Sequence, residues 1–304
     1  MYISIGSIII DDIILPDGQT KWGVFGGGST HAIVGMKVWA DSVGISAWAG
    51  TNFPPEMEAD LARHFDLTGV IRRDLPTARA WQLFEEDGRR VEVFRTDMST
   101  FVKNSPGPDE LPAAYWRASG IHFQNDVLNR FSEWIDRFRS NGSGPILWEP
   151  WGELAVPEKR QVFNEAMALV DVVSPNLLEG QTLTGLQDAE TIARALLDDG
   201  AKMVALRMGA DGSLVMDERG RMARVPAAPV EKIVDVTGAG NAYCGGFLVG
   251  YAETGDMVQA ACMGAVSASF ALGQFGALYP FEGVRERARA ALANLRALVQ
   301  AKDF

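Results

Sequence analysis

Hydrophobic residues follow two different patterns along this chain. From residue 121 onward, short apolar runs alternate with helical segments such as Val127 to Arg139 and Thr191 to Leu197. The runs that we interpret as strands are Ile121 to Phe123, Ile146 to Trp148, Val170 to Val173 and Met203 to Leu206. Alternation of this kind is typical of βαβ units, and it predicts an α/β fold with a mainly parallel sheet.

The first hundred residues are richer in strand signals. The segment Tyr2 to Ile14 contains many β-branched residues and is interrupted by Gly6, which predicts two strands. Further along, Arg79 to Phe84 and Val91 to Thr96 alternate apolar and polar residues on either side of Asp87-Gly88. That pattern predicts a half-exposed β-hairpin.

Length and charge narrow the classes of function. A chain of 304 residues suits one large α/β domain, residues 1–304. The net charge of −11 argues against nucleic acid or an anionic membrane as a partner. Cys244 and Cys262 lie in apolar stretches and are expected to be buried thiols. We find no bilayer-spanning apolar run and no signal peptide, so we expect a cytoplasmic enzyme.

A glycine turn, Gly238-Ala239-Gly240, opens one of two long apolar segments, Asn241 to Glu253 and Val258 to Leu272, that predict buried helices. Backbone amides at a helix start converge on one point, and the helix dipole adds partial positive charge there. This arrangement is an anion hole suited to a phosphoryl group in transit. A strand-like segment, Lys232 to Val236, precedes the turn. The alternative interpretation is a glycine turn that only packs or caps.

Two further features could bind phosphate groups or the metal ion that accompanies them. Asn176 and Glu179 follow an apolar strand and lie three residues apart at a helix start, where they could hold a hydrated Mg²⁺ or simply cap the helix. Arg207 ends another strand before a turn that contains Gly209 and Gly212. An arginine so placed could bind phosphate, although an ordinary hairpin turn with a solvated arginine is equally consistent.

Other chemistries lack their motifs. The sequence contains no phosphate loop ending in Gly-Lys-Ser/Thr, no complete dinucleotide fingerprint and no Gly-x-Ser-x-Gly elbow. The histidines His31, His64 and His122 are far apart and lack zinc-ligand spacing. His122 lies in an apolar strand, where a hydrogen-bonded core histidine is expected.

Taken together, these residues resemble the ribokinase-like, or PfkB, family of carbohydrate kinases over almost the whole chain. Asp235 to Asn241 is similar to the second family signature, Asp-Thr-Thr-Gly-Ala-Gly-Asp, and Gly26 to His31 to the first. Gly6 to Asp11 resembles the opening strand whose Asp binds substrate hydroxyls. Arg207 to Gly212 is similar to the turn near the nucleotide phosphates, and Ala265 to Gly276 to the helix and loop beside the adenine.

The resemblance implies a three-layer α/β/α sandwich with a small β lid from about 13–25 and 79–96, and a lid that forms a dimer contact in many members. It implies transfer of the ATP γ-phosphoryl to a sugar, nucleoside or related small alcohol. Mg²⁺ would lie near Asn176 and Glu179 through water, and a monovalent cation such as K⁺ near Asp235. The site residues implied are, for the acceptor, Asp11, Gly26, Gly27 and His31; for the nucleotide, Asn176, Glu179, Arg207, Gly209, Gly212, Thr237 and Gly276; and for catalysis, Gly238, Ala239, Gly240 and Asn241.

One departure from the family pattern bears on activity. Asn241 stands where the family has its catalytic Asp, and an amide cannot take a proton from a hydroxyl. General-base catalysis is worth roughly 10²–10⁴-fold in rate, so we expect a slow kinase of a divergent branch. Asp235 and His31 are candidate substitute bases. The alternatives are a nucleotide- or metabolite-binding sensor without turnover and a scaffold without a ligand, and the retained glycines disfavour the scaffold.

Overall fold

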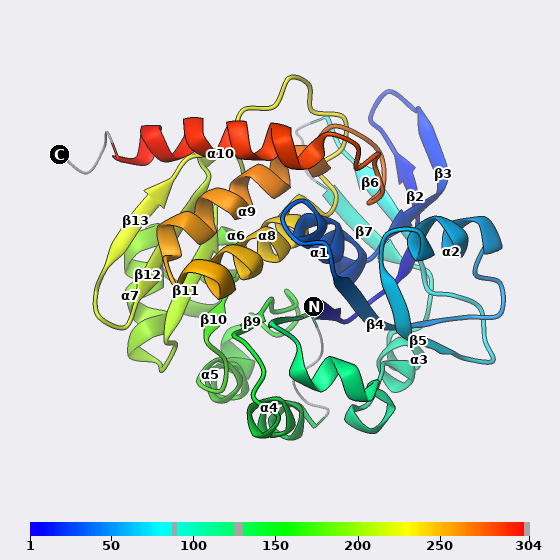
Figure 1. Cartoon of the computed structure of the whole chain (residues 1–304), viewed down its shortest axis with the longest axis horizontal. Helices are drawn as coiled ribbons and strands as arrows, with labels where there is room; N and C mark the ends of the chain where they lie inside the picture. The colour runs from blue at the N-terminus through cyan, green and yellow to red at the C-terminus, as the bar shows by residue number, and fades with distance from the viewer. Residues whose placement is uncertain (87–89, 125–129, 301–304) are drawn as a thin grey trace.

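The computed structural model describes residues 1–86, 90–124 and 130–300. Its main sheet has the strand order β13-β12-β11-β10-β9-β8-β1-β4-β5 (Figure 1). The bounds are β1 Tyr2–Ile5, β4 Val43–Ala49, β5 Asp66–Arg72, β8 Gly120–Phe123, β9 Ile146–Trp148, β10 Val172–Val173, β11 Met203–Arg207, β12 Ser213–Asp217 and β13 Met222–Val225. Pairing is parallel from β11 to β5 and antiparallel from β11 to β13. The expected mainly parallel sheet is confirmed.

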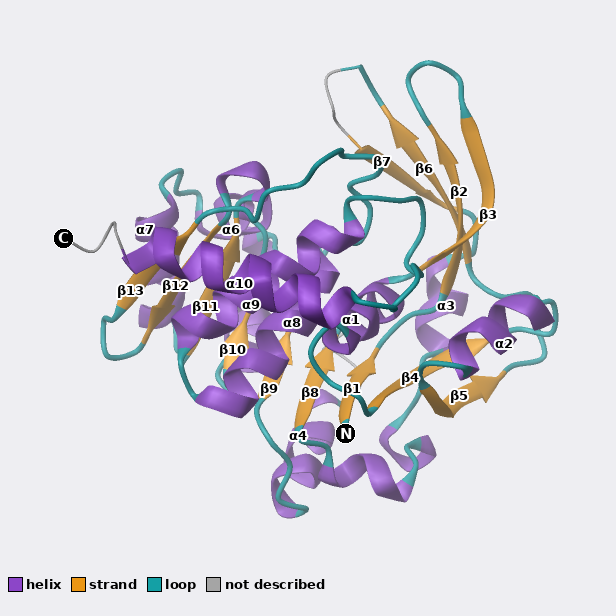
Figure 2. Ribbon diagram, turned by 45° about the horizontal axis from the view of Figure 1, so that its top comes forward, coloured by secondary structure: helices purple, strands orange, loops and turns teal. Residues whose placement is uncertain are grey.

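Helices cover both faces of this sheet (Figures 1 and 2). Their bounds are α1 Gly28–Lys37, α2 Pro55–Ala62, α3 Met98–Asn104, α4 Phe131–Ser140, α5 Arg160–Met167, α6 Leu177–Thr184, α7 Ala189–Asp198, α8 Ala239–Thr254, α9 Met257–Ala271 and α10 Val284–Gln300. One buried cluster joins α1, α8, α9 and α10 to residues such as Ile45 of the sheet. A second cluster packs helices α4, α5, α6 and α7 against the opposite face of the sheet, around Phe123 and Trp134. The chain is therefore the three-layer sandwich that the resemblance implied.

A second sheet, with the order β3-β2-β6-β7, forms the lid and extends from one end of the main sheet (Figure 2). Its strands are β2 Ile9–Ile14, β3 Thr20–Gly26, β6 Arg79–Phe84 and β7 Arg90–Phe94. Successive residues of a strand point to opposite faces, and β2 uses this alternation. Asp12 is buried against Arg79 and Arg95, at 2.6 and 3.2 Å, whereas its neighbour Asp11 lines the site cavity.

The predicted strand over Lys232 to Val236 is wrong. The amides of Val234 and Asp235 both donate to the carbonyl of Leu272 at the end of α9, at 2.8 and 3.4 Å. Because that acceptor belongs to a helix terminus and not to a neighbouring strand, the segment is an extended loop. Its apolar side chain Ile233 is 60% exposed.

The other local predictions can be compared only where the chain is described. Strands Arg79–Phe84 and Arg90–Phe94 pair antiparallel as expected, while the Asp87-Gly88 turn between them lies outside the described residues. The helix predicted from Val127 is described from Phe131 onward as α4. Within the described ranges, no helix combines the length and apolar character needed to cross a membrane.

Candidate active site

The carboxyl ends of the parallel strands gather polar side chains at one edge of the main sheet. Gln124 follows β8, Glu149 follows β9, Asn176 follows β10, and Arg207 is the last residue of β11. Open α/β sheets bind ligands outside the carboxyl ends of their strands. All four side chains border a cavity of about 640 Å³, which also reaches the lid.

Most of the predicted site residues line this cavity. They are Asp11, Gly27, His31, Asn176, Glu179, Arg207, Thr237, Gly238, Gly240 and Asn241. The predicted residues that do not line it are Gly26, Gly209, Gly212, Asp235, Ala239 and Gly276. Gly26 packs against the carboxylate of Asp11, and Gly276 lies against the backbone of Phe25 in the lid. The roles of all these residues remain predictions.

The glycine turn before α8 is open to the cavity. Gly238 is the N-cap of α8, with a φ of 74°, and a Cβ on it would overlap the imidazole of His31. The amides of Gly240 and Asn241 have no acceptor among the described residues, as expected at a helix start. The guanidinium of Arg207 also packs against Gly240, and its charge is paired with Glu149, so the positive potential at this turn comes from the helix start.

Asn241 belongs to a buried network centred on Glu149. Its Nδ2 donates to Oε2 of Glu149 at 2.9 Å, and Nε2 of His122 lies 3.0 Å from the same oxygen. The other carboxylate oxygen pairs with Nη1 of Arg207 at 2.7 Å. Arg207 also donates from Nη2 to the carbonyl of Ser174 at 2.9 Å. Glu149 is therefore hydrogen-bonded directly to Asn241, whose role remains a prediction.

Glu149 remains ionised although it is only 3% exposed. Burial alone would raise its pKa, but the attraction of Arg207 and the hydrogen bonds from His122 and Asn241 lower the pKa to about 2. Burial acts on Arg207 in the opposite sense, and the attraction of Glu149 outweighs it, so the pKa of Arg207 is raised. The two groups form a charged pair at neutral pH.

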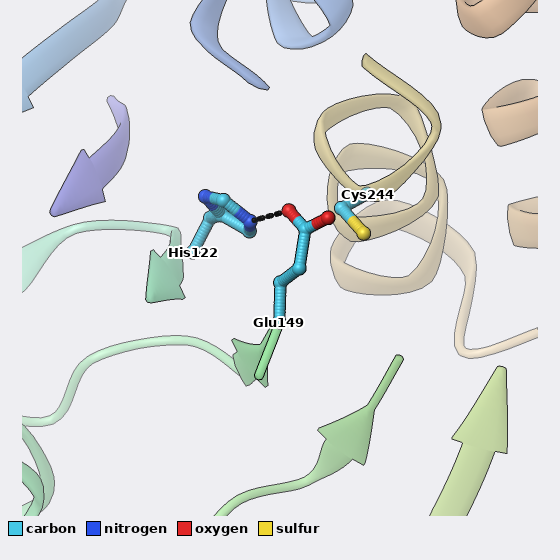
Figure 3. Close-up of side chains that lie close together, drawn as sticks. All are labelled: His122, Glu149 and Cys244. Atoms are coloured by element: carbon cyan, nitrogen blue, oxygen red, sulfur yellow. Dashed lines mark hydrogen bonds and ion pairs between the residues drawn. The ribbon is translucent and has the colours of Figure 1, made fainter. Parts of the chain in front are cut away.

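His122, Glu149 and Cys244 form a compact group with its ligand atoms within 4.8 Å of one another (Figure 3). Imidazole, carboxylate and thiolate are ligands that transition metals accept. Here, however, burial raises the pKa of the Cys244 thiol, which disfavours the thiolate, and Arg207 already neutralises Glu149. We interpret the group as an ion-pair and hydrogen-bond cluster. His122 is a hydrogen-bonded core histidine, as expected, because its Nδ1 also contacts the Ser4 hydroxyl at 2.8 Å.

Asn176 and Glu179 form a complete capping box at the start of α6. Oδ1 of Asn176 accepts from the Glu179 amide at 2.8 Å, and Oε2 of Glu179 accepts from the Asn176 amide at 2.7 Å. Both residues nevertheless line the cavity, and the second carboxylate oxygen of Glu179 is not used by the cap. Oxygen donors of this kind fit a hydrated Mg²⁺. Capping and metal binding are therefore compatible here.

Asp235 and Thr237 present oxygens without partners. Oδ1 of Asp235 accepts from the Thr237 amide at 2.8 Å, while its Oδ2 and the Thr237 hydroxyl are buried and have no hydrogen-bond partner among the described residues. Buried oxygens are seldom left unpaired. Their chemistry fits a hard monovalent cation beside the glycine turn.

The lid end of the cavity combines hydroxyl-binding groups with an aromatic wall. Nε2 of Gln82 donates to Asp11 at 3.1 Å and to Glu92 at 2.7 Å. Burial raises the pKa of Asp11 to about 7. Phe101 and Trp151 also line the cavity, and their rings are stacked with centroids 5.7 Å apart. This end can therefore hold both hydroxyl groups and a flat or apolar surface.

Comparison with known proteins agrees with this geometry. The family model described as "pfkB family carbohydrate kinase" matches residues 70–282. The chain is 29% identical to a cytidine kinase of Thermococcus kodakarensis, over 83% of this chain and 88% of that protein. It is 30% identical to protein MAK32 of Saccharomyces cerevisiae, over 91% of this chain and 85% of the relative. An adenosine kinase structure from Sinorhizobium meliloti superposes with a TM-score of 0.80 at 22% identity, covering 95% and 98% of the two chains.

The chain thus belongs to the pfkB family of carbohydrate kinases. Sequence reasoning assigned no site role to several of the lining residues, among them Glu149, Gln82 and Gln124. Glu149 and Gln124 each follow an apolar strand, and Gln82 lies within a strand that alternates apolar and polar residues. Their hydrogen-bond partners lie 10 to 117 residues away in the chain. A polar residue directly after a buried parallel strand is the signal that would have found Glu149 and Gln124.

Proposed function

We propose that this protein is an ATP-dependent phosphotransferase that moves the γ-phosphoryl to a hydroxyl of a small alcohol such as a sugar or nucleoside. One observation carries the proposal: a single cavity joins a hydroxyl-binding end at Asp11 and Gln82 to an anion-binding end at Gly238 to Asn241 and Arg207. Phosphoryl transfer depends mainly on positioning and on electrostatic stabilisation, and this cavity supplies groups for both.

The two ends of the cavity have different roles in this proposal. Asp11, Gly26, Gly27 and His31 bind and orient the acceptor, and the free amides in the first turn of α8 stabilise charge on the transferred group. The nucleotide lies along Arg207, Gly209, Gly212, Thr237 and Gly276. Mg²⁺ would be held near Asn176 and Glu179 and would neutralise phosphate charge, and K⁺ would be held near Asp235. We further propose a cytoplasmic location and a homodimer that forms through the lid.

Nucleotide binding and phosphoryl transfer are tested in two steps. With ATP and Mg²⁺ at about 100 times Kd, mass action adds about 2.7 kcal/mol to the free energy of unfolding, so the melting temperature should rise. Mg²⁺ alone and inorganic phosphate with Mg²⁺ are the controls. A panel of sugars and nucleosides is then assayed for ADP release that depends on the acceptor.

The outcomes separate the candidate functions. Acceptor-dependent ADP release supports the kinase. Stabilisation by ATP and Mg²⁺ without transfer to any acceptor supports the alternative, a nucleotide-binding sensor, which the replacement of the family's Asp by Asn241 favours. If no nucleotide shifts the melting temperature, both functions are contradicted.

A further inference from the structure

We propose that Glu149 supplies the carboxylate that the family carries at position 241, and that it accepts the proton of the attacking hydroxyl. This inference rests on the proposed phosphotransferase function. It makes Glu149 a catalytic residue and Asn241 the group that orients it. The carboxylate has not been lost from the site, but has moved from the start of α8 to the end of β9.

The geometry places the carboxylate at the required point. Oε2 of Glu149 lies 2.9 Å from the side-chain nitrogen Nδ2 of Asn241, and both side chains line the cavity. A base must come within hydrogen-bond reach of the hydroxyl that it deprotonates. An acceptor held over Gly240 by Asp11 and Gln82 would present its hydroxyl to this carboxylate.

The neighbouring groups are less suited to take the proton. Asn241 is an amide. With Nε2 of His122 as donor to Glu149, its Nδ1 accepts from the Ser4 hydroxyl, and His122 does not line the cavity. The Nε2 of His31 is buried without a hydrogen-bond partner among the described residues, so no contact orients it toward the acceptor hydroxyl. Glu179 is held in the cap of α6, where its Oε2 accepts from the Asn176 amide at 2.7 Å.

Arg207 gives the site a way to link proton transfer to nucleotide binding. While its guanidinium holds Oε1 of Glu149 at 2.7 Å, the carboxylate is a weak base. Phosphate oxygens are strong competitors for a guanidinium. When nucleotide phosphates draw Arg207 away, Glu149 loses its main positive partner and its affinity for a proton rises. The base is therefore weak in the empty site and stronger in the loaded one.

The transfer step balances as follows. The acceptor oxygen forms a bond to the γ-phosphorus, and the bond between that phosphorus and the β–γ bridging oxygen breaks. The bridging oxygen leaves with the bonding electrons as part of ADP. The hydroxyl proton passes to the Glu149 carboxylate and is then lost to water, which restores the ionised form.

The test exchanges the carboxylate between the two positions. We compare Glu149→Gln, the double variant Glu149→Gln with Asn241→Asp, and the control Glu158→Gln, which changes an exposed carboxylate nine residues away. We expect Glu149→Gln to lower kcat roughly 100-fold or more. Its Kd for ATP should be unchanged or lower, because Arg207 is then free to bind phosphate. The double variant should regain at least tenfold in kcat, and the control should retain wild-type kcat.

Two results would overturn the inference. One is wild-type kcat in Glu149→Gln. The other is a folded Glu149→Gln protein that binds ATP, has lost activity, and is not rescued by Asn241→Asp, since the role of Glu149 would then be structural. Neither result contradicts the proposed function. A wild-type protein that transfers phosphate to no acceptor would contradict the function itself, and the inference with it.

A second measurement applies if Glu149→Gln does not fold. Asn241→Asp alone places two carboxylates within 2.9 Å, and such pairs share a proton. If Glu149 is the base, the acidic limb of the kcat profile should move up by more than about one pH unit, as expected for coupled carboxylates. An unmoved limb with a faster rate would mean that Glu149 is not the base. The other groups facing this pair are His31, His122, Glu179, Arg207 and Cys244.

Discussion

At the scale of single residues, two buried carboxylates of the site have pKa shifts of opposite sign. Glu149 has an arginine partner, and its pKa is lowered to about 2. Asp11 is equally buried, but its hydrogen-bond donor is the neutral amide of Gln82, and burial raises its pKa to about 7. The same burial thus leaves one carboxylate charged and the other close to half-protonated at neutral pH.

Asp11 should make the protein less stable as the pH rises. Its folded-state pKa, about 7, exceeds the unfolded value of 3.8. The folded protein therefore keeps a proton that the unfolded chain loses between about pH 4 and 7. At roughly 1.4 kcal/mol per pH unit, the free energy of unfolding should fall by up to about 4 kcal/mol over this range. The Asp11→Asn variant should lack this fall.

Urea denaturation near pH 4.5, just inside the lower end of this range, and near pH 8, about one unit above its upper end, measures the effect. Asp17→Asn, which changes an exposed carboxylate in the turn between β2 and β3, is the matched control and should keep the wild-type slope. An Asp11→Asn protein with the same pH dependence as the wild type would show that Asp11 is not the group responsible. Glu149 acts in a more acidic range. Because its pKa is lowered from 4.5 to about 2 on folding, its contribution to the free energy of unfolding is lost as the pH falls between these values.

Single residues were predictable from the sequence where a local motif contains them. Asn241 and Gly238 lie in one contiguous signature, and both line the cavity. Glu149 was not predictable in this way, because its partner Asn241 is 92 residues away and only the sheet topology brings them together. The ionisation state of such a residue depends on contacts made by several elements.

At the scale of elements, helix α8 carries a left-handed glycine at each end. Gly238 is its N-cap, with a φ of 74°, and Gly255 its C-cap, with a φ of 65°. Any other residue at either position would be strained by about 1–2 kcal/mol. The surroundings differ, since a Cβ at Gly238 would overlap the ring of His31, whereas nothing lies within 4 Å of one at Gly255.

We therefore expect Gly238→Ala to destabilise the protein more than Gly255→Ala. The backbone strain is common to both variants, and the overlap with His31 adds a packing cost of roughly 1–3 kcal/mol at Gly238. Gly238→Ala should also abolish stabilisation by ATP and Mg²⁺, because the turn that aims the amides would shift. Chemical denaturation and thermal shift measure the two effects. Equal losses of stability in the two variants would contradict the packing argument.

Elements were predicted well where hydrophobic periodicity is set by burial. The apolar segments that became α8 and α9 are buried over most of their length, so their pattern identified them. Lys232 to Val236 has a strand-like composition but pairs with no strand among the described residues, and the amides of Val234 and Asp235 donate to the end of α9. Pairing is a property of the neighbouring segments, and a single segment does not reveal it.

At the scale of the whole molecule, the lid has large apolar side chains in contact with solvent. Trp22 of β3 is 60% exposed, Trp81 of β6 36% and Val93 of β7 37%. They come from three strands of the small sheet that extends from the body of the molecule (Figure 2). Exposed apolar side chains gathered on one small sheet are typical of an interaction surface. This agrees with the lid-mediated homodimer that we propose.

The dimer can be tested by charging one residue of the lid. If two lids pair, Trp22→Glu places a charge in an apolar contact, and the dimer dissociation constant should rise at least tenfold, which corresponds to about 1.4 kcal/mol. Leu298→Glu is the matched control, because Leu298 is 52% exposed on α10, outside the lid, and its substitution should leave the dimer intact. Sedimentation velocity over a concentration series reports both constants. A wild-type protein that sediments as a 33.0 kDa monomer at every concentration would contradict the dimer, while the cavity and its chemistry within one chain would stand.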